Sequence, residues 1–120
     1  MSVEDGIHRT VARYCQLFNS KQWDELGTMF SDDAVIITRR GTFSGRDAVV
    51  EDLKGALPPT YNGTLFATNT VITVEGDEAS AVSEFLGVDG SQITATGTYV
   101  DKLVRSGEEW LLSGKEIRLK

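Results

Sequence analysis

The sequence has very few of the residues on which metal, redox and disulfide-bonded proteins depend. It contains one cysteine, Cys15, and one histidine, His8. A single cysteine cannot form an internal disulfide, and these two residues supply too few ligands for a Cys/His metal site. His8 lies off the apolar face of its segment, so we interpret it as a solvated residue. The alternative, a metal site built from carboxylates alone, has no residues spaced for it, and we expect no metal and no cofactor.

Positive charge and long hydrophobic runs are also scarce. Twelve Lys and Arg face 18 Asp and Glu, which gives a net charge of -6 and a pI near 4.7. Phosphate binding requires clustered Lys and Arg, so we expect neither nucleic acid nor a membrane as a partner. No segment approaches the roughly 20 apolar residues that span a bilayer, and no secretory signal is visible. These absences predict a soluble, cytoplasmic protein.

The composition is that of one globular domain. Of the 120 residues, 40% are hydrophobic and 25% are charged, which is enough apolar material for one core. The sequence has no internal repeat, low-complexity stretch or linker. We expect a single domain over residues 1–120.

Helical periodicity is confined to the first half of the chain. Apolar residues recur at helical spacing from Ile7 to Phe18, and Ser2 with Asp5 resembles a capping box, which predicts a helix over residues 4–19.

The same spacing over residues 23–30 predicts a second, short helix that ends near residues 31–33. A strand is expected over residues 34–38, followed by a turn. Ser44 can cap a third helix, which ends before Pro58.

The second half has the pattern of a sheet. Gly-containing turns separate long stretches rich in β-branched residues, which predicts antiparallel strands over residues 63–75, 78–88, 92–105 and 109–120. Helices followed by strands predict an α+β domain in which a curved sheet packs its apolar face on three helices.

Several local patterns, in this order, resemble the SnoaL-like branch of the nuclear-transport-factor-2-like (NTF2-like) superfamily over nearly the whole chain. They are Tyr14, Trp23-Asp24, residues 30–34 (FSDDA), residues 45–48 (GRDA), Asn69, residues 71–79 (VITVEGDEA), residues 97–101 (GTYVD) and Trp110. The resemblance implies a cone-shaped roll with a pocket between sheet and helices. Its members include polyketide cyclases, steroid isomerases and dehydratases, and also proteins without known catalysis.

Two branches of the superfamily make specific demands on the residues. The resemblance to steroid isomerases matches Tyr14 with their helix-one tyrosine, but places Thr38 and Thr98 where their acids belong. A threonine cannot act as a general base near neutral pH. The resemblance to scytalone dehydratases places Asn19 and Leu65 at the positions of an aspartate and a histidine. We expect neither reaction in its usual form.

The residues that remain capable of chemistry are Tyr14, Asn19, Asp101 and Lys115. Tyr14 either donates a hydrogen bond to a carbonyl in the pocket or is a core tyrosine with a buried partner. Asn19 can orient a ligand but cannot carry a proton.

Asp101 lies two residues after Tyr99, hence on the same face of its strand, and Lys115 can lie across from it on the last strand. Such a pair is more often structural than catalytic. In an apolar pocket, Asp101 is the best remaining acid or base. Strand alternation does not settle which face is the pocket, because bulges shift its phase.

The leading hypothesis is a pocket protein that binds a small, largely apolar molecule and isomerises, cyclises or dehydrates it without a cofactor, with Tyr14, Asn19 and Asp101 as the catalytic candidates. The rival is a non-catalytic ligand-binding or assembly module that forms a homodimer through its sheet. Residues expected to line the pocket are Phe18, Trp23, Phe30, Thr38, Phe43, Leu65, Asn69, Phe85, Thr98 and Trp110.

Overall fold

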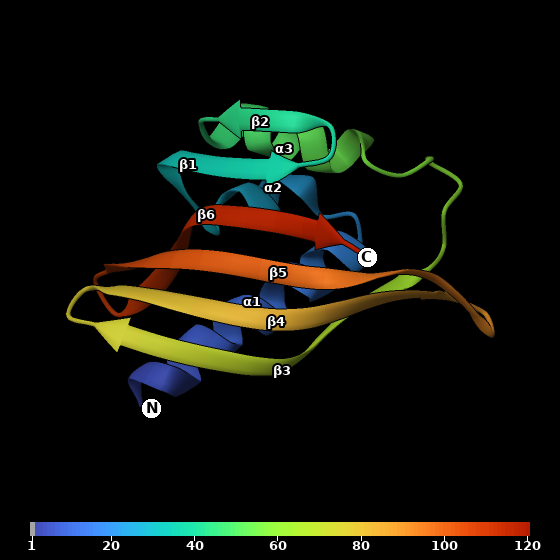
Figure 1. The fold of residues 1–120 in the computed structure, drawn as a ribbon. Helices are drawn as coiled ribbons and strands as arrows, with labels where there is room; N and C mark the ends of the chain where they lie inside the picture. The colour runs from blue at the N-terminus through green and yellow to red at the C-terminus, as the bar shows by residue number, and fades with distance from the viewer. Residues whose placement is uncertain (1) are drawn as a thin grey trace.

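The computed structural model describes residues 2–120 and shows three helices on one face of a six-stranded sheet (Figure 1). The helices are α1 (Val3–Asn19), α2 (Trp23–Gly27) and α3 (Arg46–Gly55). The strands are β1 (Phe30–Thr38), β2 (Gly41–Ser44), β3 (Thr64–Glu75), β4 (Glu78–Asp89), β5 (Gln92–Ser106) and β6 (Glu109–Leu119). This architecture confirms the predicted α+β roll.

The strand order is β2-β1-β6-β5-β4-β3. All neighbours are antiparallel except β1 and β6, which run parallel and join the two halves of the chain. Figure 1 shows the helices behind the sheet, with α1 crossing β3 to β5 and α3 lying behind β1 and β2. The core therefore lies between α1 and the inner face of the long strands. No helix within residues 2–120 is both long and apolar enough to cross a membrane.

The predicted capping box begins α1. The amide of Asp5 donates to Ser2 Oγ at 3.1 Å, and the amide of Ser2 donates to Asp5 Oδ2 at 3.3 Å. Two helix N–H groups that would lack partners are thereby satisfied. One face of the helix is buried, including Ile7, Tyr14 and Phe18, and burial of such side chains contributes roughly 1.5–3 kcal/mol each.

The boundary between α2 and β1 differs from the prediction. The second helix ends at Gly27, and Phe30 opens a strand that the sequence placed at residues 34–38. Phe30 is fully buried and pairs with Leu112 of β6. A buried Phe fits the helical spacing equally well, and the strand pairing that decides the outcome involves residues far away in the sequence.

The start of α3 is a second correction. The predicted turn before Phe43 is a hairpin whose second strand, β2, ends at Ser44. Ser44 is therefore not the cap of α3. The N-cap is Gly45, with a φ of 91° and no side-chain hydrogen bond. This left-handed conformation favours glycine.

Residues 56–63 connect α3 to β3 without regular structure, and we call them the strap. It runs down one end of the molecule, near the C-terminus (Figure 1). Leu57 packs against the core. Two side chains hold its middle: Lys21 Nζ donates to the carbonyl of Pro59 at 3.0 Å, and the Tyr61 hydroxyl lies 2.9 Å from Thr94 Oγ1.

Candidate functional site

A buried ion pair occupies the inner face of the sheet. Asp101 on β5 and Lys115 on β6 are directly opposite in the antiparallel register. Lys115 Nζ donates to Asp101 Oδ1 at 3.0 Å, and each side chain is only 1% exposed. The sequence prediction that Lys115 lies across from Asp101 is confirmed.

Two tyrosine rings enclose the ammonium group of this pair. Lys115 Nζ lies 3.7 Å from the ring centroid of Tyr99 and 4.0 Å from that of Tyr14. The negative faces of aromatic rings attract a cation, most strongly where water is excluded. We call Tyr14, Tyr99, Asp101 and Lys115 together the buried site.

Further aromatic rings pack around the buried site and close it. Phe85 stacks on Tyr99 with centroids 4.3 Å apart. On the other side, Phe18 and Phe30 contact Tyr14, with centroids at 6.1 and 6.4 Å. In this conformation, side chains fill the space around the ion pair.

One oxygen of Asp101 has no partner. Within residues 2–120, Oδ2 of Asp101 is the only buried side-chain nitrogen or oxygen without a hydrogen bond. Burial raises the pKa of this carboxyl group above its ordinary value of 3.8, and the ammonium of Lys115 opposes the rise. A desolvated carboxylate with one free oxygen is a competent proton acceptor.

The neighbours on α1 remain protonated. Burial raises the pKa of Tyr14 well above its ordinary value, so its hydroxyl can donate a hydrogen bond but does not ionise near neutral pH. Burial likewise raises the pKa of Cys15. A thiol rather than a thiolate is a poor nucleophile.

Asn19 uses its side-chain amide to hold α1 to β3. Its Nδ2 donates to the carbonyl of Leu65 at 3.0 Å, and its Oδ1 accepts from the amide of Leu65 at 2.8 Å. The side chain thus continues the hydrogen bonding of the edge strand. Both polar groups that could orient a ligand are engaged in this contact.

Most of the residues expected to line the pocket lie in the core or pack against it. Phe18, Phe30, Phe85 and Trp110 are buried in the core, and Trp23, Phe43 and Leu65 are half-buried against it. Thr38 is half-buried at the end of β1, where its hydroxyl accepts from the amide of Arg40 at 3.0 Å.

Asn69 and Thr98 do not join the buried site. Thr98 lies between the inward-facing Gly97 and Tyr99, so its side chain is on the outer face. Asn69 is exposed at a bulge in β3, with a φ of 53°, and donates to Glu84 Oε2 at 2.8 Å. The bulge shifts the alternation of β3, which local sequence patterns do not reveal.

Tyr99 in the buried site and Ser83 beside it were not among the site residues predicted from the sequence. Ser83 on β4 pairs with Tyr99, is 1% exposed, and lies 2.8 Å from Thr70 through their hydroxyl oxygens. The available signal was the two-residue spacing between Tyr99 and Asp101, which puts both on one face. For Ser83 the same signal exists, because it lies two residues before Phe85, which was expected to line the pocket.

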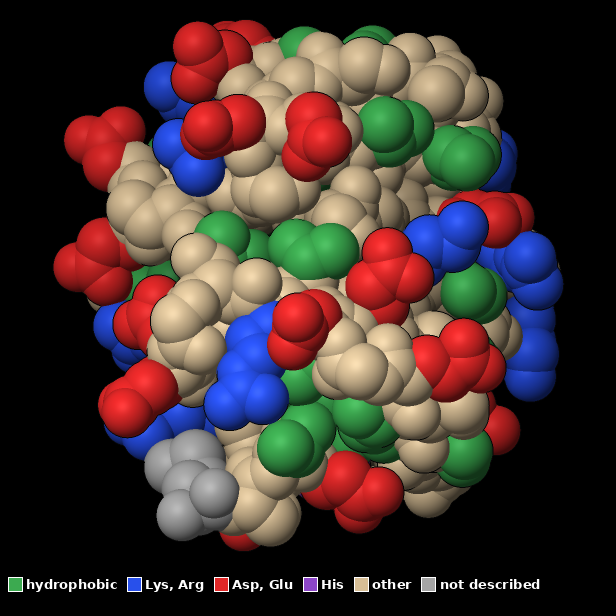
Figure 2. Space-filling model, turned by 90° about the vertical axis from the view of Figure 1, so that its left-hand side faces the viewer, with side chains coloured by type: hydrophobic (Ala, Val, Ile, Leu, Met, Phe, Trp, Pro, Cys, Tyr) green, Lys and Arg blue, Asp and Glu red, His purple; other side chains and the backbone are tan. Residues whose placement is uncertain are grey.

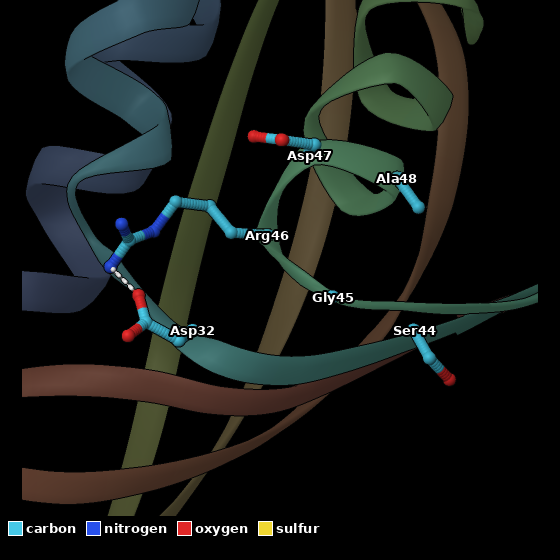
Figure 3. A pocket seen from close by; sticks show the side chains of 6 residues that line it. All are labelled: Asp32, Ser44, Gly45, Arg46, Asp47 and Ala48. Atoms are coloured by element: carbon cyan, nitrogen blue, oxygen red, sulfur yellow. Dashed lines mark ion pairs between the residues drawn. The ribbon is translucent and has the colours of Figure 1, made fainter.

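Two surface hollows lie away from the buried site. One, of about 470 Å³, is lined by Asp32 and residues 44–48 at the start of α3, where Arg46 pairs with Asp32 at 3.0 Å (Figure 3). The other, of about 1080 Å³, lies between α1 and the β5–β6 turn. Figure 2 views the side where α1 begins and shows small hydrophobic groups separated by acidic and basic side chains.

Metal ligands are not gathered anywhere in the part of the chain that the structure describes. No group of three or more His, Cys, Asp and Glu side chains within residues 2–120 is arranged to hold a metal ion. The chemical groups of the buried site are therefore a carboxylate, an ammonium and two phenols.

A curved sheet wrapped around a long first helix, with ionisable groups on its inner face, defines a cone-shaped α+β roll. The family model described as "SnoaL-like domain" matches residues 1–115 of this chain. The chain therefore belongs to the SnoaL-like domain family, whose fold is that of small-molecule-binding proteins. None of the curated proteins that were compared matches its sequence.

Several solved structures share the fold. Rv3472 from Mycobacterium tuberculosis, of unknown function, has a TM-score of 0.85 and 23% identity over 95% of this chain and 69% of its own. A putative scytalone dehydratase from Novosphingobium aromaticivorans has a TM-score of 0.83 and 23% identity over 98% and 83%.

ActVI-ORFA from Streptomyces coelicolor has a TM-score of 0.85 and 14% identity over 100% of this chain and 98% of its own. At these identities the likeness shows the fold alone, which is the NTF2-like roll expected from the sequence. A further similar structure is described as an NTF2-like protein with a cystatin-like fold.

Proposed function

We propose that the interior of the roll binds a small, largely apolar molecule and that Asp101 transfers a proton on it, without a cofactor. The observation that carries this proposal is the free Oδ2 of Asp101, buried on the inner face and without a partner among residues 2–120. A buried acceptor without a hydrogen bond costs free energy. A ligand that donates to it, or loses a proton to it, removes that cost.

Ligand entry requires the interior to open. The strap is the segment best suited to move, because it lacks regular structure and its middle depends on the two contacts of Lys21 and Tyr61. Leu57 in the strap and Leu65 just after it pack against the core. Displacement of these two side chains would open a path for the ligand from solvent toward the aromatic rings around Tyr14.

The reaction class that fits is proton abstraction next to a carbonyl, followed by proton return or loss of a leaving group. Asp101 acts as the base, and the protonated hydroxyl of Tyr14 donates a hydrogen bond to the substrate oxygen. Isomerases, cyclases and lyases of this kind need no metal. Asn19 positions α1 against β3 rather than contacting the substrate.

The test is hydrogen exchange on 2-tetralone, a bicyclic ketone with acidic hydrogens beside its carbonyl. Protein and ketone are incubated in D2O, and loss of the hydrogens is followed by NMR. We expect the wild type to accelerate exchange and Asp101→Asn to lower that rate by about a hundredfold or more. Asp89→Asn, an exposed carboxylate at the end of β4, is the matched control.

The proposal is contradicted if the wild type exchanges the ketone hydrogens no faster than Asp101→Asn or buffer does, while circular dichroism shows that both proteins are folded. In that case Asp101 has a structural role only.

The closed interior and the outer face of the sheet together favour a second candidate function, a non-catalytic dimeric module. Phe66, Val71 and Val82 are 49%, 68% and 42% exposed. Strand pairing places Leu86 beside Phe66, and Val100 beside Val82. We call these five residues the outer apolar patch, which Glu84 of β4 divides into a Phe66–Leu86 part and a part around Val82. We propose that a second copy of the chain covers this patch. A cytoplasmic location, expected from the sequence, is also a proposal.

A further inference from the structure

Lys115 carries the only full positive charge in the described interior. Apart from Asp101, the other buried polar or charged residues within residues 2–120 are Thr10 and Ser83, which are neutral. One ammonium hydrogen goes to Asp101 Oδ1, and the remainder of the group faces the rings of Tyr14 and Tyr99. Ring faces compensate a cation only partly, so the ammonium can accept a stronger anionic partner.

We infer that Lys115 is the group that holds a developing oxyanion, and that the substrates are therefore carbonyl compounds which react through an enolate. This inference rests on the proposed proton transfer at Asp101 and deepens it by naming the residue that stabilises the negative charge on the substrate oxygen. It also assigns Lys115 a direct contact with the substrate oxygen.

The charges balance during this step. Asp101 Oδ2 takes the proton from the carbon beside the carbonyl, and the electron pair of the broken C–H bond forms the C=C bond and leaves the negative charge on oxygen. Asp101 becomes neutral as the oxygen becomes anionic. The ammonium of Lys115 thus exchanges a carboxylate partner for an enolate partner, and the buried site keeps the same net charge throughout. Return of the proton to another carbon completes an isomerisation.

The same charge disfavours a different class of reaction. A carbocation formed within the buried site would lie beside a fixed ammonium, and like charges repel strongly where water is excluded. Cyclisation of alkenes through cations therefore does not suit this interior. Ketones and thioesters with acidic C–H bonds, and phenols that mimic their enolates, do suit it.

The test uses 2-naphthol, whose ionised form has a distinct absorption spectrum and mimics an enolate. Its ionisation is titrated when bound to Asp101→Asn, which imitates the protonated carboxyl of the intermediate. We expect bound naphthol to ionise at least tenfold more readily than free naphthol. The double variant D101N/K115M, which keeps an uncharged and similarly sized pair, should abolish the shift, and D101N/K115R should retain it.

The titratable groups that face Lys115 are Tyr14 and Cys15 of α1 and Tyr99 and Asp101 of β5. Burial raises the pKa of both tyrosines and of the thiol, which favours their neutral forms.

Two outcomes overturn the inference in different ways. If naphthol binds and ionises equally in Asp101→Asn and in D101N/K115M, Lys115 does not hold the oxyanion, and the proposed binding function stands. If naphthol binds to none of the proteins, including the wild type, the proposed binding function fails and this inference fails with it.

Discussion

The ion pair between Asp101 and Lys115 is unusual because both members are almost entirely removed from water. Lys115 Nζ has a carboxylate oxygen at 3.0 Å and two ring faces within 4.0 Å, whereas Asp101 keeps one oxygen without a partner. A buried carboxylate oxygen without a hydrogen bond is a feature of a site that receives a ligand. A purely structural pair has no need of the free oxygen.

Removal of one member of the pair should be costly. We expect Lys115→Met to lower the free energy of unfolding by about 3–5 kcal/mol, because it leaves Asp101 buried and unpaired. Replacing both members, as in D101N/K115M, should cost less. The measurement is urea unfolding at neutral pH. Arg118→Met, which breaks an exposed pair with Glu116, is the control and should change stability far less than Lys115→Met does. Equal effects at the two sites would contradict this account.

The titration of Asp101 should also appear in the pH dependence of stability. Burial raises the pKa of its carboxyl group in the folded state above 3.8. The folded chain then binds this proton more readily than the unfolded chain does. The resulting stabilisation is fully present below the unfolded pKa and is lost as the pH rises through the folded pKa.

The free energy of unfolding of the wild type relative to Asp101→Asn should therefore fall as the pH rises above 3.8. Urea unfolding of both proteins across a pH series measures it. A difference that grows with pH would mean that the ammonium of Lys115 outweighs burial and lowers the pKa.

The strands and helices show where sequence reasoning succeeds. The start of α1 and the β3–β4, β4–β5 and β5–β6 hairpins depend on residues close together in the chain, and the sequence predicts them well. The beginning of β1 and the existence of β2 depend on pairing with distant strands, which local patterns do not contain.

The same distinction explains the candidate site. The tight turn pairs β5 and β6 in register up to Leu103 and Leu112, and continuing that register would place Gly114 opposite Asp101. A bulge beyond Leu112 moves Lys115 opposite Asp101, so the turn alone places the pair only to within one residue. The position of Asn69 on the outer face could not be read, because a bulge in β3 alters the alternation. Thr98 was expected in the pocket, although alternation alone places its side chain on the face opposite Tyr99 and Asp101. The aromatic enclosure was also not predictable, since Tyr14 and Tyr99 come from opposite ends of the chain.

At the scale of elements, the contact between α1 and β3 depends on Asn19. Asn19→Ala leaves the amide and carbonyl of Leu65 without these partners, so we expect a loss of about 1–3 kcal/mol of stability. Hydrogen exchange should show the Leu65 amide less protected. Asn62→Ala, at an exposed position in the strap, is the control. Unchanged protection of Leu65 would show that the contact does not hold the edge strand.

At the scale of the whole molecule, the outer apolar patch predicts self-association. The outer apolar patch spans three neighbouring strands. Stable interfaces bury about 800 Å² per partner. We expect a dimer in sedimentation at tens of micromolar protein, and a monomer after Val82→Lys with unchanged circular dichroism. Val3→Lys changes an exposed apolar residue of α1 outside the sheet and should leave the dimer intact. A wild-type monomer, or a dimer that survives Val82→Lys, would rule out this surface.

The central claim is that the interior beside Asp101 receives the ligand. The most direct measurement is a titration of isotope-labelled protein with 2-tetralone, followed by NMR shifts of the backbone amides. We expect the largest NMR shifts at the amides of Tyr14, Tyr99, Asp101 and Lys115, and smaller shifts along the strap. Shifts confined to the hollow between α1 and the β5–β6 turn, or no shifts at all, would contradict it.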